Sequence, residues 1–199
     1  MLPWRLMEER SRRIVDTAIG LAELGGFDAV RLREVAARAG VALGTVYKRF
    51  PSKEDILVAA IERLVERMEQ RMKKTPLEGA TPVDRVTSFF DTATRALCRK
   101  PNLTRAVLRA MVSGEPARTD KVVYFHGRST ALIVAALRGP EPNGLDYEPV
   151  AHILQQVWFA ALVGWMGGLH KETQVVEQVR GAAKLLLLGL SAGLNGRTL

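Results

Sequence analysis

Apolar residues recur at intervals of three and four positions along nearly the whole chain, and no segment alternates between apolar and polar residues. This spacing is typical of an α-helix with one buried face, whereas a half-buried strand would alternate with a period of two. The pattern therefore predicts an all-α protein. Glycine and proline interrupt it, and between these breaks we expect helices over residues 7–24, 32–39, 43–49, 52–74, 83–99, 102–112, 117–137, 147–169 and 173–192.

The first three of these segments have the lengths expected of a helix-turn-helix. Two short helices follow a longer one, and Gly40 permits the tight turn between them. Val35, Ala36 and Val46 would close a small core beneath the turn. We therefore expect an N-terminal three-helix helix-turn-helix DNA-binding domain over residues 1–53. The remaining residues, 54–199, are more than a DNA-binding domain needs and would form a larger helical domain with a further task.

Residues 43–49 are expected to form the recognition helix, which enters the major groove of DNA. Gly44 carries no side chain there, so the backbone can approach DNA closely. Lys53, at the start of the next helix, suits a phosphate contact by charge and helix-terminal amides. The predicted DNA-binding residues are Arg31, Arg33, Leu43, Gly44, Thr45, Tyr47, Lys48 and Lys53. Arginines at positions 10, 12 and 13 either steer DNA or solvate the first helix, and the sequence leaves both interpretations open.

The stretch from Leu32 to Leu57 resembles the DNA-binding signature of the TetR family of repressors. That resemblance implies a homodimer that binds a palindromic operator, dimerises through its last two helices and holds a regulatory ligand among the middle ones. Residues 54–199 would then be a helical ligand-binding and dimerisation domain. The family favours threonine just before the second helix, where this chain has Val30 and Arg31. The departure weakens the expected helix cap and adds a candidate phosphate contact at Arg31.

Three further runs, residues 79–85, 100–106 and 157–165, are similar to the repressors of sterol catabolism within this family. Their inducers are coenzyme A thioesters of steroid or fatty acids, so the resemblance implies a hydrophobic or acyl-CoA effector. A cluster of basic residues would then either meet the nucleotide phosphates or form ordinary solvated faces: Arg95, Arg99, Lys100, Arg105 and Arg109.

Large apolar side chains in the middle helices are candidates for the ligand site, although each is also a candidate for the core. They are Phe89, Phe90, Val107, Met111, Tyr124, Trp158, Trp165 and Met166. The last two predicted helices are apolar on more than one face, which favours a dimer interface. The residues expected there are Ile153, Val157, Ala160, Ala161, Gly164, Val175, Val179, Ala182, Leu186 and Leu190.

Composition restricts the partners and the classes of function that this chain can have. A net charge of +8 favours a polyanionic partner such as double-stranded DNA. The single cysteine forms no internal disulfide and no metal-ligating spacing occurs, so we expect no metal, no cofactor and a reducing cytoplasm. The longest apolar stretch is too short for a membrane span. The three histidines show no catalytic spacing, which argues against an enzyme.

The alternative function is a DNA-binding protein whose C-terminal domain serves only dimerisation or a protein partner, without a small-molecule inducer.

Overall fold

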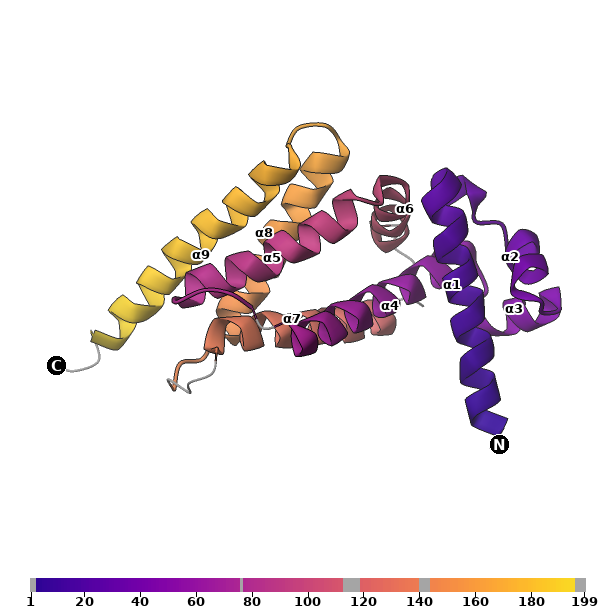
Figure 1. Cartoon of the computed structure of the whole chain (residues 1–199), viewed down its shortest axis with the longest axis horizontal. Coiled ribbons are helices and arrows are strands. Elements are labelled where there is room, and N and C mark those ends of the chain that lie inside the picture. Colours follow the sequence, from indigo (N-terminus) through magenta and orange to yellow (C-terminus); the bar gives the residue numbers. More distant parts are fainter. Residues whose placement is uncertain (1–2, 76, 113–118, 140–143, 196–199) are drawn as a thin grey trace. The chain divides into compact units, whose positions relative to one another are not determined.

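The computed structural model describes residues 3–75, 77–112, 119–139 and 144–195, and these residues form α-helices joined by turns, with no strand among them. The all-α prediction is therefore confirmed. The helices, labelled in Figure 1, are α1 (Pro3–Ala29), α2 (Leu32–Ala39), α3 (Leu43–Arg49), α4 (Lys53–Lys74), α5 (Pro82–Cys98), α6 (Pro101–Val112), α7 (Thr119–Arg138), α8 (Glu148–Met166) and α9 (Glu172–Asn195).

The chain folds into two compact units. Unit 1 contains residues 1–67 and 99–125, and unit 2 contains residues 68–98 and 126–199. The helix-turn-helix thus shares its unit with the first part of α4, with α6 and with the start of α7.

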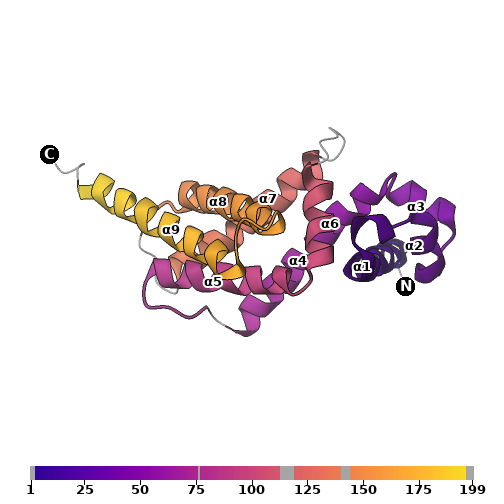
Figure 2. The same ribbon diagram turned by 90° about the horizontal axis from the view of Figure 1, so that it is seen from above.

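Unit 1 is built around α1, which packs against α2 and α6. The α1 helix is interrupted at Gly25 and Gly26, where the backbone leaves helical geometry and Gly26 adopts a φ of +69°. This is where the apolar pattern predicted the first helix to end. Figure 2 shows α1, α2 and α3 gathered into one bundle.

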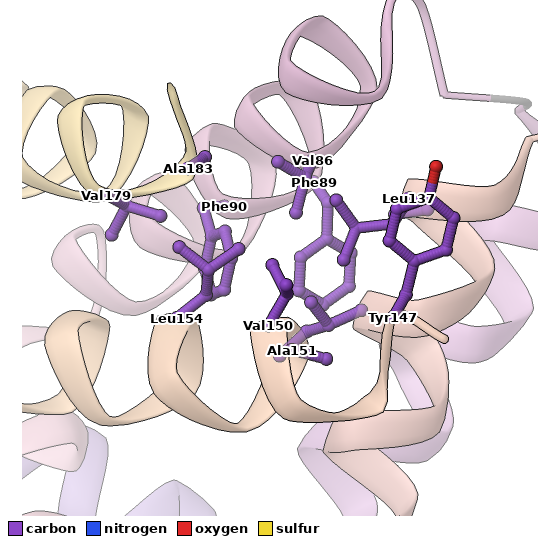
Figure 3. Close-up of a cluster of buried hydrophobic side chains, with 12 residues drawn as sticks. Val86, Phe89, Phe90, Leu137, Tyr147, Val150, Ala151, Leu154, Val179 and Ala183 are labelled. Carbon is purple, nitrogen blue, oxygen red and sulfur yellow. The ribbon is translucent and has the colours of Figure 1, made fainter. Parts of the chain in front are cut away.

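Unit 2 encloses a hydrophobic core made by α5, α7, α8 and α9 (Figure 3). Phe89 and Phe90 of α5 point towards Val150 and Leu154 of α8, and Val179 of α9 closes the same cluster. Arg85 binds α5 to the end of α7, because its guanidinium donates to the carbonyl oxygens of Ala136 and Leu137 at 3.1 and 2.9 Å. No helix among the described residues is long and apolar enough to span a bilayer.

Candidate nucleic-acid interface and ligand site

The turn between α2 and α3 has the geometry that the sequence predicted. Gly40 ends α2 in the left-handed conformation with a φ of +64°. The Gly40 and Val41 amides donate to the carbonyl oxygens of Ala37 and Ala36, which is the hydrogen-bond pattern of a Schellman motif. Glycine is the residue that adopts this conformation without steric cost. The bounds expected for both short helices are confirmed.

A small apolar core fixes the recognition helix on the helices behind it. Val35 and Val46 have no exposed surface, and Ala36 is 4% exposed. Ile14 and Ala18 of α1 are also fully buried. Val46 is the one fully buried residue of α3, and one side of this helix is turned towards solvent.

The outward face of α3 carries the predicted base-reading residues. Gly44, Tyr47 and Lys48 are exposed, and their spacing of three and four places them on one side of the helix. Leu43 and Thr45 are half-buried beside them. A Cβ at Gly44 would meet no atom within 4 Å, so this position is a gap in the side-chain surface. Such a gap allows close approach by another backbone.

The residues at the start of α2 add positive charge to a helix that packs against α3. Arg31 occupies the N-cap position with an extended backbone and makes no side-chain cap hydrogen bond. The missing cap follows from the absence of threonine at this point in the sequence. Arg31 and Arg33 are both exposed, and neither forms an ion pair within the described residues.

Lys53 differs from the other basic candidates, because the fold already supplies it with partners. Its ammonium lies 3.6 Å from an Asp28 carboxylate oxygen and 3.9 Å from the centre of the Phe27 ring. The side chain is 29% exposed. Lys53 opens α4, next to a capping box in which the Ser52 hydroxyl and Asp55 carboxylate satisfy each other's backbone amides. The apolar pattern does not indicate the contacts with Phe27 and Asp28, which lie far from Lys53 along the chain.

The predicted ligand residues are divided between the two units. Phe89, Phe90 and Trp158 meet in unit 2, with ring centres 5.1 Å apart in the first pair and 5.4 Å apart in Phe90 and Trp158. Trp165 and Met166 lie half-buried at the end of α8. The other three belong to unit 1: Val107 is buried, Met111 is half-buried and Tyr124 is 58% exposed.

Two polar contacts in unit 2 were not predicted from the sequence. The Trp158 indole donates to the Thr94 hydroxyl at 2.9 Å, and the Thr130 hydroxyl lies 2.9 Å from the Gln155 amide oxygen. Thr94, Thr130 and Gln155 are all buried. The sequence does contain an indication of the Thr94 contact. Thr94 follows Phe90 by one helical turn, so a polar residue stands on the apolar side of the helix.

The basic residues considered for nucleotide phosphates are largely paired with carboxylates. Arg95 contacts Asp91 at 3.0 Å, Lys100 contacts Glu23, and Arg109 lies 3.8 Å from Asp28. Arg99 and Arg105 are exposed.

Cys98 forms no disulfide, and burial raises the pKa of its thiol to about 11, which keeps the thiol protonated at neutral pH. No cluster of three or more potential metal ligands occurs within the described part of the chain.

The expected dimer residues of α8 and α9 fall on both sides of these helices. Val175, Val179 and Ala161 are buried inside the chain, and a Cβ at Gly164 would overlap the ring of His170. These four positions therefore pack within the subunit and offer a partner no surface. Val157, Ala182, Leu186 and Leu190 are half-buried, whereas Ile153 and Ala160 are exposed.

Other apolar side chains form the outer surface of the same two helices, which lie side by side in Figures 1 and 2. On α8, Ile153 and Val163 are 43% and 39% exposed. On α9, Leu185 and Leu188 are 73% and 69% exposed. We call these four residues and Ala160 the outer α8–α9 face.

A helix-turn-helix with an exposed recognition helix, joined to a second helical unit, defines the class of DNA-binding regulators. The family models narrow this class. Residues 14–60 match the model described as bacterial regulatory proteins of the tetR family, and residues 79–186 match the tetracyclin repressor-like C-terminal domain. The chain belongs to the TetR family, as the sequence resemblance implied.

Individual relatives agree with this assignment. The HTH-type transcriptional repressor KstR of Rhodococcus jostii is 36% identical over 180 residues, covering 90% of this chain and 84% of that protein. The KstR of Mycobacterium tuberculosis is 33% identical over 179 residues, covering 90% and 81%. These are the sterol-catabolism repressors to which the sequence resemblance pointed.

Two solved structures have the same fold. A TetR transcriptional regulator from Rhodococcus sp. RHA1 superposes with a TM-score of 0.79 at 30% identity, covering 90% of this chain and 97% of that one. Thermus thermophilus FadR, a TetR-family repressor solved in complex with lauroyl-CoA, has a TM-score of 0.68 at 20% identity, covering 89% and 93%. The family consists of transcriptional regulators and not of enzymes.

Proposed function

We propose that this protein is a transcriptional repressor that binds a palindromic operator as a homodimer in the bacterial cytoplasm. The observation that carries the proposal is the outward face of α3, where Gly44, Tyr47 and Lys48 stand exposed on a helix held from behind by Val46. Arg31 and Arg33 supply phosphate contacts beside it. Two such helices reading symmetric half-sites require a twofold dimer, and the outer α8–α9 face is the surface that we assign to it.

We further propose that a hydrophobic or acyl-CoA ligand bound by unit 2 releases the operator. The KstR relatives are repressors, and the structurally similar FadR carries lauroyl-CoA. In this chain the aromatic group of Phe89, Phe90 and Trp158 would contact an apolar chain or ring system. The Thr94 hydroxyl would give such a ligand a polar partner. Release requires that the ligand bind more tightly to the conformation that does not bind DNA.

One observation also supports the alternative function without an inducer: Phe90 is fully buried and Phe89 is 5% exposed. Side chains packed in this way are also what an ordinary core requires. In that case unit 2 would serve only dimerisation or a protein partner, with no small-molecule inducer.

The assignment of Lys48 and Lys53 to the DNA-binding surface, here called the DNA face, is tested by the salt dependence of binding. The ligand is a duplex that the wild-type protein selects from a random-sequence pool. Lys48→Ala and Lys53→Ala should each weaken binding and reduce the slope of log affinity against log salt by about 0.9 for each phosphate that is no longer neutralised. Arg71→Ala, which removes an exposed charge near the end of α4, is the matched control. If neither variant differs from the control, the assigned DNA face is wrong.

The ligand is tested by thermal melting with lauroyl-CoA, a bile-acid CoA thioester and free coenzyme A. A specific effector at about one hundred times its dissociation constant should stabilise the protein by about 2.7 kcal/mol and weaken operator binding. Thr94→Val and Phe90→Leu should reduce this stabilisation. If no thioester stabilises the protein or alters operator binding, the second function is favoured.

A further inference from the structure

The break in α1 brings the Phe27 ring and the Asp28 carboxylate next to Arg109 of α6. Beyond Gly25 and Gly26 the chain presents Phe27 and Asp28, and α6 packs along α1 at this point. The side-chain amide of Asn102 in α6 donates to the carbonyl oxygens of Glu23 and Leu24, at 3.3 and 3.4 Å, where the regular part of α1 ends. These bonds join α6 to the last regular turn of α1. The position of Phe27 and Asp28 relative to α6 is therefore well defined.

Phe27 and Asp28 hold two cations that come from different helices. The Lys53 ammonium of α4 and the Arg109 guanidinium of α6 lie 3.9 and 4.1 Å from the centre of the Phe27 ring. The same two groups lie 3.6 and 3.8 Å from the two Asp28 oxygens. Aromatic faces and carboxylates both attract cations, so each group competes for the same partners. One negative charge is thus shared between two positive charges.

This sharing has a consequence for DNA binding. With Arg109 in place, the cluster of Lys53, Arg109 and Asp28 has a net charge of +1, and Asp28 neutralises Lys53 only in part. Without Arg109, the carboxylate would be left to Lys53 alone and the cluster would be neutral. A neutral cluster gives a phosphate at the start of α4 little attraction.

We propose that Arg109 of α6 is a positioning residue that sets the strength of the phosphate contact made by Lys53, by sharing Asp28 with it. The proposal rests on the proposed DNA-binding function, because it requires Lys53 to contact DNA. It also gives α6 a defined effect on operator affinity: a movement of α6 that draws Arg109 away from Asp28 weakens the Lys53 contact. Only two residues, Arg99 and Lys100, separate α6 from α5 of unit 2.

The expected size of the effect follows from Coulomb's law. A charge about 8 Å from a phosphate in a water-like dielectric changes the affinity of one half-site by about two- to threefold. A dimer contains two half-sites, so removal of the Arg109 charge should weaken operator binding by about four- to tenfold. The slope against salt should also decrease, because fewer counterions are released.

The experiment measures binding of full-length variants to the selected duplex by fluorescence anisotropy, from about 50 to about 200 mM salt. Arg109→Gln should weaken binding by about four- to tenfold, whereas Arg109→Lys should retain most of the affinity. Lys100→Gln is the matched control: it removes an equal charge immediately before α6 and breaks the contact with Glu23, whereas Lys53 pairs with Asp28. It should change affinity by less than about twofold.

Asp28→Asn supplies the converse test, since it removes the charge that restrains Lys53. It should strengthen binding, and adding it to Arg109→Gln should restore most of the affinity. Equal effects of Arg109→Gln and Lys100→Gln, or no recovery in the double variant, would overturn the proposal. Melting temperatures of Arg109→Gln and Lys100→Gln report any common weakening of α1–α6 packing, which Asp28→Asn would not repair.

Lys53→Gln separates failure of this inference from failure of the proposed function. If Lys53→Gln weakens binding but Arg109→Gln does not, only the role of Arg109 is wrong. If Lys53→Gln leaves both affinity and salt slope unchanged, Lys53 makes no phosphate contact, and both the inference and this part of the DNA face fail.

Discussion

Gly44 shows at the scale of one residue how folding and DNA binding can make opposite demands. Alanine is a better helix former than glycine, and a Cβ at this position would meet no atom within 4 Å. Gly44→Ala should therefore fold normally and gain up to about 1 kcal/mol of stability. Its methyl group would occupy the space that a DNA backbone or base edge needs, so operator binding should weaken at least about tenfold, equivalent to a loss of about 1.4 kcal/mol.

Gly20→Ala is the matched control for this variant, since Gly20 of α1 is also exposed and a Cβ there also meets nothing within 4 Å. Urea unfolding and binding to the selected duplex should be measured for both proteins. Equal operator affinity in the two variants would show that the gap at Gly44 plays no part in recognition.

Gly40 makes the opposite case, because its conformation serves the fold. Its φ of +64° lies in the left-handed region, which costs other residues roughly 1 kcal/mol or more. Gly40→Ala should lower the free energy of unfolding by about 1 kcal/mol, measured by urea denaturation, whereas Gly40→Asn should lose less. Unchanged or increased stability of Gly40→Ala, as expected for Gly20→Ala inside α1, would contradict this interpretation of the turn.

At the scale of the helix, the start of α5 offers a stability contribution that depends on pH. The Thr81 hydroxyl donates to Asp84 at 2.7 Å, the Thr81 amide donates to the same oxygen at 3.1 Å, and the Asp84 amide returns a bond to the hydroxyl. The hydrogen bond from the Thr81 hydroxyl is the largest cause that lowers the pKa of Asp84 below its ordinary value of 3.8. The folded state therefore favours the ionised carboxylate.

A lowered pKa in the folded state contributes stability above the unfolded value and loses it as the pH falls through the folded value. Asp84→Asn should therefore be less stable than the wild type at about pH 6, and the difference should shrink as the pH falls below 3.8. Urea midpoints across this range measure the difference. Thr81→Val, which removes the hydroxyl donor, should reduce the same pH dependence; a constant difference at every pH would contradict the assignment.

The helices themselves were predictable where glycine and proline mark their ends. Gly40 and Pro51 bound the two short helices of the helix-turn-helix, and both were predicted residue for residue. The end of α8 was expected at residue 169 but falls at Met166, because the backbone turns at Gly167 and Gly168, where Gly168 has a φ of +79°. A glycine pair inside an apolar run leaves open which residue is the last helical one.

Pairing between distant residues was not predictable. Lys53 was expected on the DNA face from its position at the start of a helix, but its contacts with Phe27 and Asp28 depend on how α1 breaks and packs. Periodicity identifies the apolar side of a helix and leaves its neighbours unspecified. For the same reason the predicted ligand residues of α6 gave no indication that α6 belongs to unit 1.

At the scale of the whole molecule, α9 shows why an interface is difficult to predict from a helix that is apolar on several faces. The regular stripe that includes Val175 and Val179 is the one buried inside the subunit. Leu185 and Leu188, which lie outside that stripe, remain exposed. Both sets are apolar, and only the packing of α9 on α5 and α8 decides between them.

We therefore predict that the outer α8–α9 face holds the dimer together. In a twofold dimer each substitution occurs twice, so Leu185→Glu with Leu188→Glu changes four side chains in one interface. If each leucine buries enough area for about 1.5 kcal/mol, their loss weakens association by about 6 kcal/mol, or roughly ten-thousand-fold. Analytical ultracentrifugation should then find a monomer with unchanged helicity, because both side chains already face solvent within the single chain.

The matched control places two glutamates on exposed apolar positions of unit 1, Leu24→Glu and Val112→Glu, where the side chains are 76% and 66% exposed. This variant carries the same added charge and should remain a dimer. The monomeric variant should also bind a duplex with two half-sites no more tightly than a duplex with one, since the gain from a second half-site requires two linked recognition helices. A Leu185→Glu, Leu188→Glu protein that sediments as the wild-type dimer would place the interface on another surface.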